Sequence, residues 1–441
     1  MLARTTSATL NLLDSLASRS LLHTTRDDHS PQLRYRLLET IRAYAHDRLV
    51  EQGDGDATRE RHALRIVERL DSAAFMPLST RPEHRLLADD ALAAIDWAHA
   101  NGDTALGAQL VCAASTIFIA RGLFDKGMIL HEWAATGDDP VMRSNVYAVG
   151  AILAMAGGTR GMKRFAERSL EAAADLPVPW RSHPHAVLMV QNVFVDSDRF
   201  VENLRLGREA GSHPEADPLL QHSIDSQEAA WLIWHGDRAA AIAIVKQARW
   251  VPDLEPLISM NLHGAHLLAH LLAGDRAGIA VHLRDPAISP LRAGWIESVR
   301  RGEHWLISYE AIRAGSVGFL GDHDRARRDL ADVIALLNVD RMPGVDADLL
   351  GAFAWICIGA GEPERAVELL DDTWSLARSP NTSILLIAAE QHARGNVDRD
   401  LSVAGSGEIV RRFTMSEIVQ REQRTRKMLE SELARLGLSS R

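Results

Sequence analysis

A glycine followed by an acidic residue recurs between apolar segments in the second half of this 441-residue chain. The clear copies begin at Gly236, Gly274, Gly321 and Gly361, and a degenerate copy begins at Gly395. Successive glycines are 38, 47, 40 and 34 residues apart. Glycine allows the chain to reverse tightly, and the acidic residue can cap the following helix. The pattern therefore predicts pairs of helices joined by short turns.

Repeats with these spacings are typical of tetratricopeptide-like and related α-solenoids. One helix pair cannot bury its apolar face alone, so neighbouring pairs must stack. We therefore predict a mainly α fold, with an irregular tetratricopeptide-like solenoid over residues 101–400. Linker helices are expected over residues 54–100, and a charged helix is expected within residues 401–441. The uneven spacing predicts irregular repeats instead of a uniform array.

The N-terminal part of the chain has a different pattern from the repeats. Residues 10–22 show helical periodicity, and a hairpin-like segment over residues 21–37 follows them. Apolar and charged residues alternate along the second arm of this segment, which is the period of a half-buried strand. Helical periodicity resumes over residues 38–53. Helix, hairpin and helix in this order predict a partial winged-helix module with one β-hairpin over residues 1–53.

The charge of the chain gives only limited support for nucleic-acid binding by this module. The formal net charge of −10 excludes a chain that grips nucleic acid through its whole surface. Four arginines of the module remain as candidate nucleic-acid contacts: Arg19, Arg34, Arg36 and Arg42. Asp27 and Asp28 occupy the expected tip of the hairpin, where phosphate contacts would fall. Direct DNA binding by the module is therefore kept as an alternative function.

Hydropathy and cysteine usage indicate an intracellular environment. No apolar run approaches the roughly 20 residues that a helix needs to cross a bilayer, and the N-terminus has no apolar core of a signal peptide. We therefore expect a cytoplasmic protein with no membrane partner. Cys112 and Cys357 lie far apart in apolar segments, which predicts two buried thiols and neither a disulfide nor a metal site.

A set of three histidines is a weak candidate for a metal site. His263, His266 and His270 share one face of a predicted helix, because offsets of three and seven residues align. Neither an HExxH pattern nor a nearby cysteine supports zinc binding, so packed or solvated histidines are the better interpretation. No nucleophile motif such as Gly-x-Ser-x-Gly occurs. We predict no catalytic, cofactor-binding or metal-binding residues, and an all-helical metal-dependent enzyme is the less favoured alternative.

Three short segments resemble actinobacterial STAND-type transcriptional regulators, which are similar to the LuxR-type and AfsR-like ATPases. Residues 12–22 (LLDSLASRSLL) and 34–49 (RYRLLETIRAYAHDRL) resemble the end of that family's winged helix. The typical sequence motifs of the family in this region are close to LLDxLVDKSLL and RYRLLETIREYAxERL. Residues 92–103 (LAAIDWAHANGD) resemble NLRAALxWALxxGD, the family's entry into its helical repeats. Together these segments span about the first quarter of the chain.

The resemblance implies a regulatory role. In that family a P-loop ATPase core of the NB-ARC kind precedes the winged helix, and the helical repeats sense an inducer or a partner protein. This sequence starts at Met1 inside the winged helix and contains no Walker motif, so no ATP-binding residue is carried over. The resemblance therefore implies a non-catalytic sensor portion without a cofactor. Its expected partners are a protein or small inducer in the repeat groove and a separate NB-ARC ATPase chain.

Overall fold

The computed structural model describes residues 6–27, 30–70, 87–156, 161–192, 196–214, 216, 218–247, 256–286, 288, 292–293, 296, 307–336, 343–370, 373, 380–395 and 415–435. Within these ranges the chain is mainly α-helical, and its strands form one two-stranded antiparallel sheet. This confirms the predicted fold class of a mainly α chain with a single β-hairpin. None of the helices in these ranges is long and apolar enough to cross a membrane.

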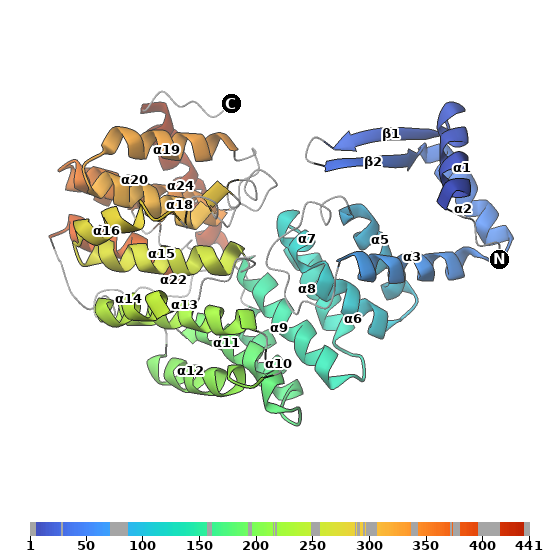
Figure 1. Cartoon of the computed structure of the whole chain (residues 1–441), viewed down its shortest axis with the longest axis horizontal. Helices are drawn as coiled ribbons and strands as arrows, with labels where there is room; N and C mark the ends of the chain where they lie inside the picture. Colours follow the sequence, from blue (N-terminus) through green and yellow to red (C-terminus); the bar gives the residue numbers. More distant parts are fainter. Residues whose placement is uncertain are drawn as a thin grey trace.

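The N-terminal module consists of a helix, a hairpin and a second helix (Figure 1). Its elements are α1 (Thr6–Ser18), β1 (Leu22–Asp27), β2 (Ser30–Leu37) and α2 (Glu39–Glu51). The strands pair antiparallel, with Leu22 opposite Leu37. Gly53 follows α2 with a φ of +73°, which glycine adopts without strain. The expected strand-to-helix unit is present, but α2 contains no buried residue.

A group of helices connects this module to the repeats. They are α3 (Gly55–Leu70), α5 (Ala88–Ala100), α6 (Thr104–Ala113), α7 (Ser115–Ala120) and α8 (Phe124–Ala134). α3 buries Ala63, Ile66, Val67 and Leu70 in a core shared with α5 and α6. The expected linker helices are therefore α3 and α5, and residues 71–86 lie outside the described residues.

The repeats form two layers of helices. The first layer contains α9 (Pro140–Ala156), α11 (Ser182–Asn192), α13 (Pro218–Trp234), α15 (Pro256–Leu272), α18 (Ile307–Phe319) and α20 (Pro343–Gly359). The second layer contains α10 (Met162–Ala172), α12 (Ser197–Gly211), α14 (Arg238–Gln247), α16 (Arg276–His282), α19 (His323–Leu336) and α21 (Pro363–Leu370). Each first-layer helix packs against the next first-layer helix and against its own second-layer partner (Figure 1). This is the stacking that the spacing of the turns predicts.

The glycine–acid turns form as the sequence predicts. The five glycines Gly236, Gly274, Gly321, Gly361 and Gly395 all have φ values between +66° and +98°. In the first three turns the following aspartate accepts a hydrogen bond from the backbone N–H three positions later, over 2.8–3.3 Å. These turns therefore end one helix and cap the next.

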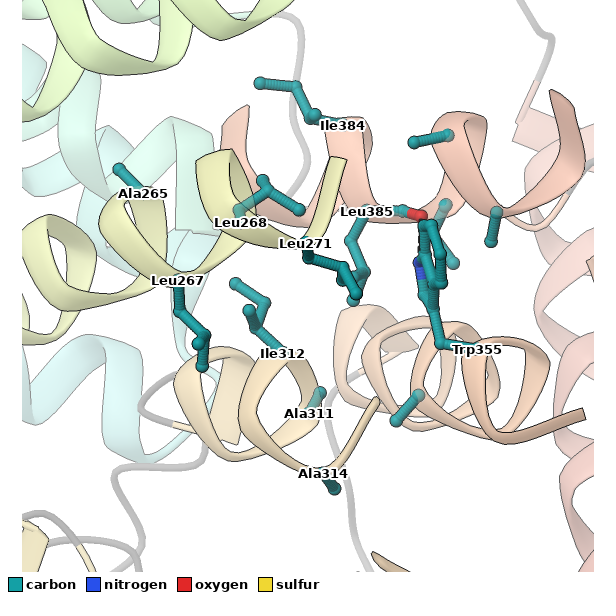
Figure 2. Close-up of a cluster of buried hydrophobic side chains, with 14 of the residues drawn as sticks. Ala265, Leu267, Leu268, Leu271, Ala311, Ile312, Ala314, Trp355, Ile384 and Leu385 are labelled. Atoms are coloured by element: carbon teal, nitrogen blue, oxygen red, sulfur yellow. Dashed lines mark hydrogen bonds between the residues drawn. The ribbon is translucent and has the colours of Figure 1, made fainter. Parts of the chain in front are cut away.

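Helix α22 (Pro380–Ala393) crosses the first layer and does not simply extend the stack. It contacts α13, α15, α18 and α20, and the Asn381 amide donates to the Asn261 carbonyl oxygen over 2.9 Å. Residues 384–389 are all buried. Figure 2 shows Trp355 beside Leu385, whose carbonyl oxygen accepts a hydrogen bond from the indole N–H over 3.0 Å. A helix that is apolar on every side must be enclosed, and α22 is enclosed by these first-layer helices and by α21 of the second layer.

Helix α24 (Met415–Arg435) covers the C-terminal end of the stack. Leu429 and Leu433 join the main hydrophobic core. The buried carboxylate of Glu432 pairs with Arg365 of α21 over 2.8 Å. The charged helix expected near the C-terminus is therefore packed against α20 and α21, and the other residues of the 401–441 segment lie outside the described residues.

Glycines allow α18 and α20 to approach each other closely. A Cβ atom at Gly359 would lie 2.4 Å from the carbonyl oxygen of Gly318, and one at Gly318 would lie 2.6 Å from Cγ1 of Ile356. Both distances are shorter than any ordinary contact, and the first involves backbone that cannot rotate away. The short distance between α18 and α20 therefore requires residues without a side chain at Gly318 and Gly359.

We predict that Gly359→Ala destabilises the chain by about 1–3 kcal/mol, because the added methyl group must push α20 away from α18. The midpoint of urea unfolding measures this effect. Gly207→Ala in α12 is the matched control, since the nearest heavy atom to the added Cβ would be Cδ1 of Ile224 at 3.4 Å and alanine favours a helix over glycine. Equal midpoints for the two variants would contradict the close approach.

Candidate functional site

A group of histidines lies between the two helices of one repeat. His263, His266 and His270 lie on one face of α15, as the sequence predicts, and His282 of α16 adds a fourth ring. The Nε2 atoms of His266 and His270 are 3.2 Å apart, and the Nδ1 atoms of His266 and His282 are 3.3 Å apart. The ring centroids of His263 and His282 are 5.5 Å apart. Only His266 is partly exposed.

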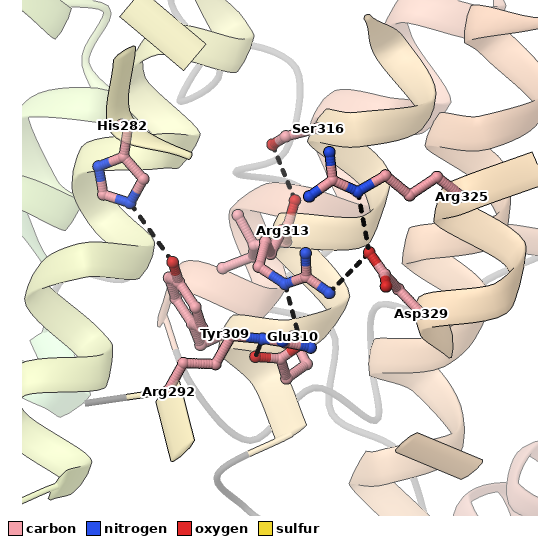
Figure 3. Close-up of polar contacts among 9 residues, drawn as sticks. His282, Arg292, Tyr309, Glu310, Arg313, Ser316, Arg325 and Asp329 are labelled. Atoms are coloured by element: carbon pink, nitrogen blue, oxygen red, sulfur yellow. Dashed lines mark hydrogen bonds and ion pairs between the residues drawn. The ribbon is translucent and has the colours of Figure 1, made fainter. Parts of the chain in front are cut away.

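Two further residues extend this group at its ends. Nδ1 of His270 lies 2.8 Å from Oδ2 of Asp275, the partly exposed residue that caps α16. Nε2 of His282 lies 3.5 Å from the hydroxyl of Tyr309 in α18 (Figure 3). We call the series Asp275, His270, His266, His282 and Tyr309 the histidine chain. It runs from the helix cap of one repeat to the first-layer helix of the next.

Gly278 provides the space for one end of the histidine chain. A Cβ atom at this position would lie 2.1 Å from Nδ1 of His270 and 2.4 Å from Oδ2 of Asp275. Any larger residue would therefore displace the His270 ring or the carboxylate. The hydrogen bond between them depends on a glycine in the first turn of α16.

His263, His266 and His282 are neutral at pH 7. Burial lowers the pKa of His263 and His266 to about 4 and that of His282 to about 2, and neighbouring rings add to the effect. Burial also raises the pKa of Tyr309, which keeps its hydroxyl proton. A neutral imidazole has one N–H and one lone pair, so each ring donates at one edge and accepts at the other. The histidine chain is therefore a directional series of hydrogen bonds.

The three predicted histidines do not converge on one point. His266 directs Nε2 at His270 and Nδ1 at His282, so its opposite edges meet different neighbours. Among the residues that the structure describes, no group of three or more histidine, cysteine, aspartate or glutamate side chains could hold a metal ion. Hydrogen-bonded imidazole rings in this arrangement can bind protons and pass them from one ring to the next.

An ion network lies on the other side of α18 (Figure 3). Glu310, which is 1% exposed, pairs with Arg292 over 2.8 Å and with Arg313 over 2.9 Å. Arg313 also lies 2.9 Å from Asp329 of α19. Burial alone would lower the pKa of Arg313, but the charges of Glu310 and Asp329 raise it overall. Buried charges are stable only with such partners, so the network connects α18 to α19.

Sequence reasoning found part of the histidine chain and missed His282 and Tyr309. A signal for His282 was present, because His266 and His282 both lie eight residues from Gly274 in the turn. Helices that pair antiparallel bring positions at equal distances from their turn side by side. Tyr309 has no comparable local signal, since it belongs to the next repeat. Asp275 was expected only as a helix cap.

The arginines predicted as candidate nucleic-acid contacts lie in several elements of the N-terminal module. Arg34 and Arg36 both lie on β2. Arg19 follows the end of α1, and Arg42 of α2 pairs with Glu39 over 2.5 Å. The structure therefore places two of the four arginines on the same strand.

A small pocket lies between α10, the 3-10 helix η1 (Val178–Arg181), α11 and α12. Its volume is about 330 Å³, and its mostly apolar lining includes Arg181, His185 and Glu209. The Arg181 guanidinium donates to the Ala174 carbonyl oxygen over 2.6 Å. Burial lowers the pKa of His185, whose Nδ1 lies 2.8 Å from the Asn203 amide oxygen. A pocket of this size and mixed lining fits a small organic molecule.

Comparisons with known proteins identify no relative. No protein-family model matches the chain, and no curated protein matches it in sequence. The functional argument therefore rests on the contacts described above and on the resemblance of the short N-terminal segments.

We predict that Arg313→Met lowers the free energy of unfolding by about 3–5 kcal/mol, because it removes one partner of the buried Glu310 and one of Asp329. Urea unfolding followed by circular dichroism measures this change. Arg205→Met is the matched control, since Arg205 pairs with Glu202 and Glu209 on the exposed surface of α12. Similar unfolding midpoints for the two variants would show that the network contributes nothing beyond surface ion pairs.

Proposed function

We propose that this chain is the non-catalytic sensor and protein-interaction portion of a cytoplasmic transcriptional regulator. The helical repeats would receive an inducer or a partner protein, and the N-terminal module would pass the response to an NB-ARC-type P-loop ATPase unit. The transcriptional context comes from the resemblance of residues 12–22, 34–49 and 92–103 to STAND-type regulators. The mode of interaction comes from the exposed side chains of the module.

One observation carries the proposal: the N-terminal module leaves large apolar side chains in solvent. Leu10, Leu12, Tyr44 and Val50 are 43–59% exposed. Leu22 is the one buried residue among the described side chains of α1, β1, β2 and α2. Exposed apolar side chains gathered in one small module are a feature of interaction surfaces. A docked protein domain would supply the missing core of this module.

The helical stack supports the sensing part of the proposal. α22 covers the first layer from α13 to α20, so we place the inducer or partner at the N-terminal part of the repeats. The pocket between α10 and α12 lies there, and its lining suits a small molecule with both apolar and polar groups. Binding would favour one packing of these helices over another. α3 would transmit the change, because it contacts α2 at one end and packs on α5 and α6.

We predict that the chain forms a complex with the P-loop ATPase unit encoded in or beside its gene, and that Tyr44→Glu weakens this complex at least tenfold. A tenfold loss corresponds to about 1.4 kcal/mol, which burial of an unpaired carboxylate exceeds. Isothermal titration calorimetry with the purified proteins measures the affinity.

The control variant is Ile129→Glu, because Ile129 is 64% exposed on α8, away from the N-terminal module. The proposal expects this variant to bind like the wild type. No complex, or an equal loss of affinity in both variants, would contradict it. If the module instead binds DNA, a gel shift would show affinity that falls steeply with salt concentration.

A further inference from the structure

We propose that the histidine chain is an acid-sensitive latch, which holds α16 against α15 at neutral pH and releases it when a second proton enters. The inference is independent of the proposed function, since it concerns only contacts within the repeats. It rests on the four close contacts that link Asp275 to Tyr309 through three imidazole rings.

The neutral chain has one consistent arrangement of protons. His270 donates from Nδ1 to the Asp275 carboxylate and accepts at Nε2 from His266. His266 accepts at Nδ1 from His282, and His282 accepts at Nε2 from the Tyr309 hydroxyl. Every ring then has one N–H and one occupied lone pair. The tautomers alternate along the chain: Nδ1–H at His270, Nε2–H at His266 and Nδ1–H at His282.

One additional proton from water can be accommodated by reversing the chain. His270 then has both N–H groups, and its positive charge lies beside the Asp275 carboxylate. His266 accepts at Nε2 and donates from Nδ1 to His282, which accepts at Nδ1 and donates from Nε2 to the Tyr309 oxygen. The three rings now have four N–H protons in total, one in each of the four contacts of the histidine chain. The contacts between α15, α16 and α18 all remain hydrogen bonds.

A second additional proton has no acceptor. The His270–His266 and His266–His282 contacts hold one proton each. The contacts of His270 with Asp275 and of His282 with Tyr309 hold one ring proton each. A fifth ring proton would therefore set two N–H groups against each other at 3.2–3.3 Å. It would also place two positive charges on three rings in close contact, and like charges repel strongly in a largely buried site. One contact between rings must then break, and the His266–His282 contact is the one that joins α15 to α16.

The charged groups around the histidine chain do not change its limit of one additional proton. Lys246 of α14 opposes protonation of His266, and Asp285, which follows α16, favours it. His263 lowers the pKa of His282. On α18, the neighbouring charges of Glu310 and Arg313 are committed to each other in the ion network. The Asp275 carboxylate is in hydrogen-bond contact with the His270 ring, and it serves only the first added proton.

The direction of the pH effect follows from burial. His263, His266 and His282 have pKa values far below 6.5 in the closed structure and recover the ordinary value when the interface opens. The open state therefore binds more protons below pH 6.5. The stability of the closed interface is complete above pH 6.5 and decreases as the pH falls toward 4.

Hydrogen exchange of the full chain at pH 7.5 and pH 5.0, corrected for the intrinsic rate, tests the latch. Each ring that stays neutral in the closed state contributes up to roughly 30-fold to the opening constant over this interval. We expect the amides of α16 to become at least that much more exposed to exchange, while α9 and α10 serve as the internal reference. A change below about threefold would overturn the proposal.

Variants separate the latch from general acid destabilisation. His282→Gln cannot take up a proton but retains a donor and an acceptor, so the acid response of α16 should decrease by up to about 30-fold. His62→Gln on α3 is the matched control, because this side chain is 44% exposed, and its acid response should equal that of the wild type. An unchanged response in His282→Gln would refute the latch.

A second measurement uses the wild-type chain and so does not depend on a variant folding. Nitrogen NMR of labelled histidine at pH 7.5 identifies the tautomer of each ring. The proposal expects the alternating pattern, with Nδ1–H on two of the linked rings and Nε2–H on the third. Finding Nε2–H on all three would contradict it, because the contact between His266 and His282 would then have two acceptors and no proton.

Discussion

The structure depends on the enclosure of α22. Residues 384–389 are buried on every side of this helix, so it needs apolar surfaces all around it. First-layer helices α13 to α20 provide them, and Leu267, Leu271 and Ile312 belong to the same core (Figure 2). The last repeats thus pack around a segment of their own chain. Helix α24 covers the C-terminal end of this core.

α18 is the helix on which the polar contacts of this core meet. All its residues from Ile307 to Gly318 are buried, yet it contains Tyr309, Glu310 and Arg313. Each of these has a partner on a different neighbour, so the histidine chain and the ion network fix α18 relative to α16 and α19. Polar contacts of this kind are directional, whereas apolar packing alone is tolerant of small shifts. Changes in protonation therefore act on the α15–α16 pair, next to α18.

The parts of this fold that depend on local sequence patterns could be predicted, whereas the contacts between residues far apart in the sequence could not. The turn at Gly274 and Asp275 specifies a helix end, a positive φ and a cap, all within five residues. The face shared by His263, His266 and His270 follows from helical spacing in the same way. The path of α22 does not, because its apolar residues fit any buried helix, and its contact with Asn261 spans 120 positions. The approach of Gly318 and Gly359 likewise has no local signature.

The most direct test asks whether α22 remains in place when a partner binds. Spin labels at the exposed positions Ala239 of α14 and Arg394 just after α22, with Cys112 and Cys357 replaced by serine, report the distance between this helix and the second layer. Our account predicts one narrow distance distribution that is the same before and after addition of the ATPase unit. A broad distribution, or a shift on binding, would show that α22 leaves the first layer and that the partner takes its place.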